Sequence, residues 1–179
     1  EKTLLLLENN KYSELRELLE NTNRADLALL IDELPKEEAI IVFRILPKEL
    51  AAETFVYMDG DTQEHLITAL TDIEVEEVMS KLNLDDTVDI IEEMPAIVVK
   101  RILRNTEAPM RNLINEFLKY PEDSAGSIMT IEFVDLKKDM TVEQAFARIR
   151  MSALNKETVY TCYVLDDKRK LIGIVTVKD

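Results

Sequence analysis

Two aspartates in the stretch NLDDTVDIIEE have the type and spacing needed to share a divalent cation. Asp85 and Asp89 are four residues apart, so in a helix they lie on one face, roughly opposite an apolar stripe. Mg²⁺ prefers oxygen ligands and often keeps its waters while binding one or two carboxylates. The pair therefore predicts part of a magnesium site that a second domain would complete. Solvent-facing acids without a ligand are the alternative.

Other polar residues carry weaker signals. Glu49 and Glu53 repeat the same spacing in KELAAETF, and Asp86 can simply face solvent beside Asp85. His65 is the only histidine and has no Cys or His partner at zinc spacing, which favours an ordinary surface histidine.

Catalysis has no candidate residues in this sequence. It contains no nucleophile–base set, glycine-rich phosphate loop or HExxH motif, so we expect no enzyme. The single Cys162 alternates within an apolar segment and is expected to be a buried small residue. No apolar run approaches the ~20 residues of a membrane helix. The missing initiator Met suggests a piece of a longer protein.

The negative charge is concentrated in the first two thirds of the chain. Residues 1–120 hold 26 acids against 13 bases, net −13, whereas residues 121–179 hold 10 against 9, net −1. Proteins bind nucleic acids and anionic lipids through Lys and Arg side chains. This acidic surface would repel both, so they are excluded as partners of residues 1–120. It should attract cations, although an acidic face that only maintains solubility is the plainer interpretation.

A twelve-residue repeat predicts the elements that carry these acids. Its ladder consists of Leu34, Leu46, Met58, Leu70, Leu82 and Met94. The residues after the ladder positions are mostly N-cap types or first-turn prolines. Apolar residues at positions 5, 8, 9 and 12 of each unit form one helical face. One such short helix is unstable alone, so the repeat predicts an α-superhelix, or solenoid, of stacked short helices. From about Ala108 the repeat goes out of phase, which predicts a longer closing helix.

The last part of the chain changes period. Residues 131–136 read as a strand and residues 140–151 as a helix, with Thr141 and Gln144 spaced as a capping box. Two further strands are expected around the polar turn 166–170. The expected inward positions of the helix are Val142, Ala145, Phe146 and Ile149. The fold class is thus an α-superhelical repeat followed by a partial α+β domain of β-α-β-β order.

The stretch YPEDSAGSIMT, together with LPKELAAETF and LDDTVDIIEEMP, resembles the MgtE-type magnesium transporters. In that family an acidic helical N domain leads into a pair of CBS motifs and then a membrane pore. The resemblance implies an N domain at residues 1–120, a junction at 121–130 and a truncated first CBS motif at 131–179. The second CBS motif and the pore are missing from the sequence, so we expect no transport by this chain alone.

The resemblance also implies site residues. It supports Asp85 and Asp89 as Mg²⁺ ligands and adds Glu53. CBS pairs often hold adenosine nucleotides, so Phe133 and Arg150 could contact base and phosphate; a core phenylalanine and a surface arginine are the plainer interpretation.

The function implied is a cytosolic magnesium-sensing region. It would gate the pore by Mg²⁺-dependent closure of the N domain on the CBS domain, at the cytoplasmic face of the cell membrane. The partners implied are the second CBS motif and the membrane pore of the same chain, and the full protein is expected to be a homodimer. Pro121 and Gly126 end the solenoid and let the backbone turn at a joint, which is either a hinge or a mere connector.

Two other functions remain open from the sequence. An α-solenoid scaffold for a protein partner, similar to the flagellar motor switch protein, would need a hydrophobic groove rather than an acidic one. A nucleotide-sensing CBS module on an unrelated helical arm would bind nucleotide without responding to magnesium.

Overall fold

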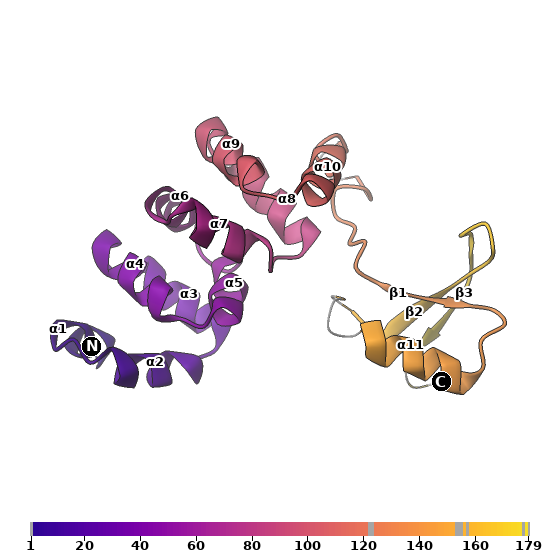
Figure 1. Ribbon diagram of the computed structural model, residues 1–179, viewed down its shortest axis with the longest axis horizontal. Helices are drawn as coiled ribbons and strands as arrows, with labels where there is room; N and C mark the ends of the chain where they lie inside the picture. The colour runs from indigo at the N-terminus through magenta and orange to yellow at the C-terminus, as the bar shows by residue number, and fades with distance from the viewer. Residues whose placement is uncertain (1, 122–123, 153–155, 157, 177, 179) are drawn as a thin grey trace. The chain divides into compact units, whose positions relative to one another are not determined.

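The structure, a computed structural model, describes residues 2–121, 124–152, 156, 158–176 and 178. The chain divides into a helical unit, Glu1–Ser127, and a sheet unit, Ile128–Asp179, which are distinct in Figure 1. Among the described residues, no helix is both long and apolar enough to cross a membrane.

The helical unit is built from short helices that begin at a fixed interval. They are α1 (Lys2–Glu8), α2 (Tyr12–Glu20), α3 (Arg24–Asp32), α4 (Lys36–Ile45), α5 (Lys48–Phe55), α6 (Gly60–Ala69), α7 (Asp72–Met79), α8 (Leu84–Glu93), α9 (Ala96–Arg104) and α10 (Ala108–Phe117). From α2 to α10 each helix begins twelve residues after the one before it. The predicted superhelix of short helices is therefore confirmed.

Helices two positions apart in the chain pack on one another. α3, α5, α7 and α9 follow one another in contact, and α4 contacts α6 as α8 contacts α10. Figure 1 shows these helices as a stack that advances from α1 to α10. The repeating structural unit is therefore a pair of helices, twice the length of the sequence repeat.

The leucine ladder lies in the core of this stack. Five of its members are between 3% and 8% exposed, namely Leu46, Met58, Leu70, Leu82 and Met94. Polar residues cap some of the helices: the Asp59 carboxylate accepts the Thr62 N–H at 2.7 Å, and Thr71 with Glu74 forms a capping box. Such caps satisfy first-turn N–H groups, and from α1 to α10 only two to four residues separate one helix from the next.

The expected longer closing helix is wrong. α10 spans Ala108–Phe117, ten residues, and begins in phase with the other units. Pro109 in its first turn has a fixed φ suited to a helix start, which explains why the chain restarts here as in earlier units.

The sheet unit has the expected β-α-β-β order. Its elements are β1 (Val134–Lys137), α11 (Val142–Ser152), β2 (Thr161–Leu165) and β3 (Leu171–Thr176). β1 pairs in parallel with β2, and β3 pairs antiparallel to β2, in the order β1-β2-β3. The buried core consists of Val134, Leu136 and Cys162, with Ala145 and Ile149 of α11 packed against it. Cys162 is 1% exposed, as the alternation predicted.

Two details of the sheet unit differ from expectation. β1 begins three residues late, because its parallel pairing with β2 starts at Val134, so Phe133 precedes the strand rather than lying on it. Val142 and Phe146 are 68% and 39% exposed, so only part of the expected inward stripe of α11 contacts the sheet. The capping box is confirmed: the Thr141 N–H donates to the Gln144 side chain at 2.9 Å, and Thr141 Oγ1 accepts the Gln144 N–H at 3.3 Å.

The turn after α10 is packed rather than open. A Cβ placed on Gly126 would lie 2.5 Å from Cδ1 of Tyr120, whose ring also packs edge-on against Phe117 at 5.7 Å. The Ser127 N–H and hydroxyl both donate to the Ser124 carbonyl, at 3.1 and 2.9 Å. Gly126 does not have a positive φ, so a glycine is required here by the close approach of a ring. The expected use of Gly126 for backbone freedom is thus corrected.

Gly126→Ala is expected to destabilise the helical unit by roughly 1–3 kcal/mol, the usual cost of overpacking, because the Tyr120 ring has to move. The matched control is Gly173→Ala, since a Cβ there meets no atom within 4 Å. Thermal unfolding followed by circular dichroism measures both. Equal midpoints for the two variants would contradict this packing, and Tyr120→Ala should relieve the defect of Gly126→Ala.

Candidate functional site

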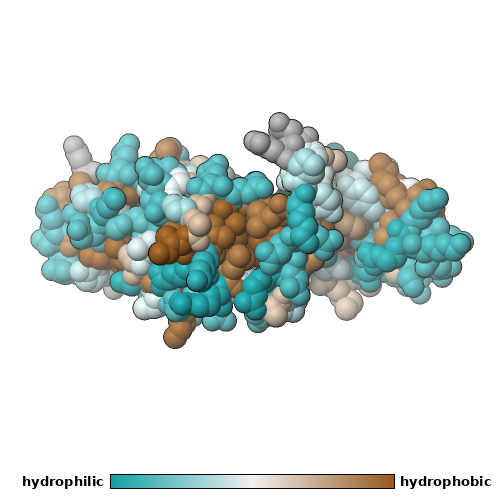
Figure 2. Space-filling view, turned by 90° about the horizontal axis from the view of Figure 1, so that it is seen from above, coloured by the Kyte–Doolittle hydropathy of each residue, from teal (hydrophilic) through white to brown (hydrophobic). Residues whose placement is uncertain are grey.

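Ion pairs cross the helical unit between helices two or three positions apart. They are Arg24–Glu53 at 2.7 Å, Arg44–Glu74 at 2.8 Å, Lys48–Glu77, Lys81–Glu49 at 2.6 Å, and Arg101–Asp72 and Arg104–Asp72 at 3.0 and 2.8 Å. On the face seen in Figure 2, hydrophilic side chains alternate with hydrophobic ones. Exposed pairs contribute about 0–1 kcal/mol each. Because acids outnumber bases two to one in residues 1–120, many carboxylates still have no cation to pair with.

α8 carries the two acids that the spacing singled out. Asp85 lies in its first turn and is half-buried, whereas Asp89 lies one turn later and is exposed. The opposite face, with Thr87, Ile90 and Ile91, is buried. Asp89 therefore points away from the core as expected, and Asp85 does so only in part. Their role as metal ligands stays a prediction.

The other predicted metal ligand is engaged elsewhere. The Glu53 carboxylate accepts a hydrogen bond from Arg24 Nε at 2.7 Å, and Glu49 accepts one from Lys81 at 2.6 Å. The pKa of Glu49 is lowered, first by that hydrogen bond from Lys81. Within the described residues no three Asp, Glu, His or Cys side chains lie close enough to hold a metal, which leaves His65 outside any such group. A complete site would need ligands from elsewhere.

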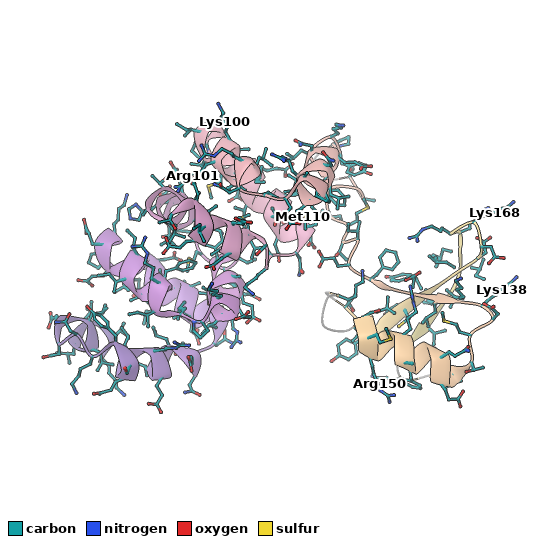
Figure 3. All side chains as sticks on the ribbon, in the orientation of Figure 1. Lys100, Arg101, Met110, Lys138, Arg150 and Lys168 are labelled. Atoms are coloured by element: carbon teal, nitrogen blue, oxygen red, sulfur yellow. The ribbon has the colours of Figure 1, made fainter. Side chains whose placement is uncertain are left out.

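The two predicted nucleotide contacts have different surroundings. The Phe133 ring packs edge-on against Tyr163 at 5.2 Å, and the residue is half-buried. Arg150 is exposed near the end of α11, where its guanidinium lies 5.8 Å from the Phe146 ring; its label in Figure 3 marks this position. Phe133 and Arg150 thus lie against different rings, Tyr163 and Phe146. Their nucleotide role stays a prediction.

Two groups that lie outside the predicted sites, Cys162 and Asp32, have pKa values raised by burial. Burial raises the pKa of the Cys162 thiol, whose sulfur lies 3.6 Å from the Val159 carbonyl, so this cysteine is no candidate nucleophile. Burial, foremost, and the charge of Asp59 raise the pKa of Asp32, while a hydrogen bond with Thr62 opposes them. Neighbouring carboxylates therefore already repel one another on this unit.

Arg44 and Glu74 form the best-defined ion pair of the helical unit. Two guanidinium N–H groups of Arg44 donate to the two Glu74 oxygens at 2.8 and 3.1 Å, and the Thr71 N–H donates at 2.6 Å. The hydrogen bonds from Arg44, first of all, lower the pKa of Glu74 to about 2. Sequence reasoning missed this pair because its members are thirty residues apart, with no local signal.

Comparison with known proteins gives two family matches. The MgtE intracellular N domain matches residues 22–123, and the CBS domain matches residues 125–179. Curated relatives include the magnesium transporters MgtE of Thermus thermophilus, 34% identical over 101 residues, and of Enterococcus faecalis, 38% identical over 66 residues. These matches cover 54% and 37% of this chain but only 22% and 15% of the relatives. The chain thus matches less than a quarter of their length.

Solved structures match over nearly the whole chain. A crystal structure of the cytosolic domain of the Mg²⁺ channel MgtE in complex with ATP has a TM-score of 0.89 and 31% identity, covering 98% of this chain and 72% of that one. The soluble part of a magnesium transporter has a TM-score of 0.87 at 22% identity, covering 98% and 70%. The second similarity supports the fold alone.

Glu74→Gln is expected to weaken the fall of the free energy of unfolding as the pH is lowered from 7 to 2. The folded pKa, about 2, lies below the ordinary 4.5, so ionised Glu74 stabilises the fold above pH 4.5 and loses this effect as the pH falls toward 2. The variant should therefore be less stable than the parent at pH 7, by about 1 kcal/mol after allowing for solvent screening, and equally stable near pH 2. Glutamine keeps an acceptor for the Thr71 N–H, so the difference isolates the charge.

Urea unfolding at several pH values measures the effect, with Glu33→Gln as the control because Glu33 is exposed and makes no ion pair among the described residues. Parallel curves for Glu74→Gln and its parent between pH 7 and pH 2 would show that the Arg44 pair does not stabilise the fold.

Proposed function

Since this chain belongs to the MgtE N-domain family and continues into a CBS domain, we propose that it is the magnesium-sensing regulatory region of a magnesium channel or transporter. The observation that carries the proposal is the family match over residues 22–123, which contain the acid-rich helices. The curated relatives that match part of the chain are magnesium transporters by name. The chain holds no candidate catalytic set, so its role would be regulatory rather than enzymatic.

The metal proposed for this region is Mg²⁺, and the residues present suit a shared, hydrated site. Asp85 and Asp89 provide two carboxylates on consecutive turns of α8, and Mg²⁺ commonly uses one or two carboxylates beside its own waters. Because no described group of three ligands exists, the remaining ligands would be waters and acids of the CBS domain. Glu53 could bind the same Mg²⁺ only if its carboxylate gave up its ion pair with Arg24.

The proposed mechanism is electrostatic. Carboxylates of the N domain and of the CBS domain repel one another when no cation is present, and binding a shared Mg²⁺ removes that repulsion. Two unit charges 4 Å apart interact by about 4 kcal/mol at an effective dielectric of 20. A few such pairs are enough to move a two-state equilibrium from open to closed, since about 5.5 kcal/mol reverses a 1:99 ratio. The closed state would keep the pore shut.

The cellular location and the partners that we propose rest on the same family membership. We place this region at the cytoplasmic face of the cell membrane, attached to the pore of the full-length protein. Its partners would be the second CBS motif and the pore of the same chain, together with a second copy in a homodimer. The acidic surface argues against nucleic acid as a partner.

The test is Asp85→Ala with Asp89→Ala in the full-length protein. The double variant should require a higher Mg²⁺ concentration for protease protection of the junction at residues 121–130, because two ligands are lost. Its pore should stay active but respond less to inhibition by cytosolic Mg²⁺. Its stability should change by no more than about 0.5 kcal/mol, since like charges four residues apart repel.

Glu33→Ala with Glu37→Ala is the matched control, because it removes two exposed acids of the same spacing from the same unit. Protection curves that coincide for the Asp85/Asp89 variant and its parent would show that these aspartates are ordinary solvated acids. Loss of all transport would instead assign them to the ion pathway and contradict a sensor role.

Nucleotide sensing by the CBS domain is a second candidate function, favoured by the relative of 31% identity that was crystallised with ATP. Phe133 and Arg150 would contact the base and the phosphates. Calorimetric titration of the full-length protein with ATP should then show binding that Phe133→Ala and Arg150→Ala each weaken about tenfold. Lys137→Ala, an exposed cation of the same unit, is the control. Unchanged affinity in both variants would place the nucleotide elsewhere.

A further inference from the structure

A basic hollow lies along α9 and the start of α10, on a chain whose net charge is −14. It has a volume of about 950 Å³ and is open to solvent. Four cationic side chains line it, Lys100, Arg101, Arg104 and Arg111, and no Asp or Glu belongs to its described lining. Residues 94–111 hold four bases and one acid, Glu107, so this stretch is basic within an otherwise acidic helical unit.

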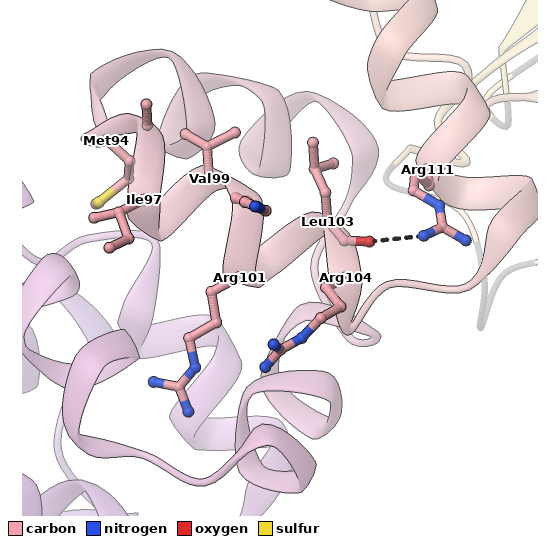
Figure 4. Close-up of a pocket in the computed structure, with 9 residues that line it drawn as sticks. Met94, Ile97, Val99, Arg101, Leu103, Arg104 and Arg111 are labelled. Atoms are coloured by element: carbon pink, nitrogen blue, oxygen red, sulfur yellow. Dashed lines mark hydrogen bonds between the residues drawn. The ribbon is translucent and has the colours of Figure 1, made fainter.

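The floor of the hollow is aliphatic. Met94, Ile97 and Leu103 contribute to it, and Ile97 is 79% exposed although it is a large apolar residue. Figure 4 shows Ile97 and Leu103 on α9, Met94 just before that helix, and Arg111 on α10 with its side chain toward Leu103. Exposed aliphatic groups ringed by cations are typical of a surface that a partner covers.

The hollow has more cationic side chains than nearby acids to pair with them. Asp72 pairs with both Arg101 and Arg104, at 3.0 and 2.8 Å. Arg111 donates to the Leu103 carbonyl at 3.3 Å, and within the described structure neither Lys100 nor Arg111 makes an ion pair. Two positive charges are thus left over, and the hydrogen bonds of the arginines hold their guanidinium groups in place, which favours recognition of carboxylates.

The position of α9 in the stack indicates what kind of element could cover the hollow. α3, α5, α7 and α9 pack in series, and α9 contacts α7 on one side. Within the helical unit no described odd-numbered helix follows α9, so its other side ends the series. Earlier steps in the series join aliphatic contacts to cation–carboxylate pairs, as between Lys48 of α5 and Glu77 of α7.

We propose that this hollow binds an acidic amphipathic helix of a partner protein, which packs as the next helix of the series. Its carboxylates pair with Lys100 and Arg111, and its aliphatic side chains cover Ile97. The hollow shape and aliphatic floor fit a helix in a groove. An aromatic ring on which a nucleotide base could stack is absent from the described lining. An anionic membrane is disfavoured because it would repel the helical unit as a whole, whose residues 1–120 carry a net charge of −13.

The probe is a fluorescein-labelled synthetic peptide of about 18 residues, long enough to form a helix, with Leu on one helical face and Glu on the others. Fluorescence anisotropy with the whole chain measures its affinity. Lys100→Glu and Ile97→Gln should each weaken binding about tenfold, the first by charge reversal and the second by loss of apolar contact. Both residues are exposed, so circular dichroism should show an unchanged fold.

The matched control is Lys138→Glu, an exposed lysine of the sheet unit that Figure 3 labels beside Lys168. Its affinity for the peptide should stay within about twofold of the parent. Equal binding of a peptide with Gln in place of Glu would overturn the recognition of carboxylates. Equal loss in Lys138→Glu and Lys100→Glu would overturn the assignment to the hollow. Sedimentation with phosphatidylserine vesicles that depends on Lys100, without peptide binding, would replace the helix by a membrane surface.

Discussion

The fold depends on the fact that a helix of seven to eleven residues cannot hold itself together. Each helix has a buried stripe, and the stripe is covered only by helices that come later or earlier in the chain. Leu46, Leu70 and Met94, for example, follow the ends of α4, α6 and α8, and all three are buried. Stability is therefore a property of neighbours, and the polar surface is free to vary as long as those stripes remain.

That freedom explains how the chain can carry so many acids. The bases of the helical unit are used mainly between helices, as in Arg44–Glu74 and Lys48–Glu77, where they join elements that are distant in sequence. Among the described residues, acids that make no ion pair, such as the exposed Asp89, are left to solvent and dissolved ions. A surface of this kind attracts cations, and its charge can be neutralised without any change in the core, which suits the sensor role that we propose.

The sequence predicted the local features well and the non-local ones poorly. Helix starts were predictable because caps and prolines follow the ladder residues directly, as at Pro47 and Thr71. The packing of α5 on α7 rather than on α6, and the pair Arg44–Glu74, depend on contacts some thirty residues apart that no spacing reveals. Gly126 was recognised as special, but its reason, the ring of Tyr120, lies in three dimensions. Asp85 and Asp89 were assigned from their spacing, with support from the family resemblance, whereas Glu53, Phe133 and Arg150 came from the resemblance. The described residues of this chain complete neither a metal site nor a nucleotide site.

The alternation of helices also limits how such a chain can change its length during evolution. Contacts between helices two places apart join odd-numbered helices to one another (α3, α5, α7, α9) or even-numbered ones to one another (α4 with α6, α8 with α10), and we call these two sets layers. The loss of a single twelve-residue segment would exchange the two layers for every helix after it. A stripe shaped for one layer would then face the other, and the cross-helix charges would meet the wrong partners. Loss or duplication of two consecutive segments keeps every later helix in its own layer. Homologous domains of different length should therefore differ by even numbers of helices.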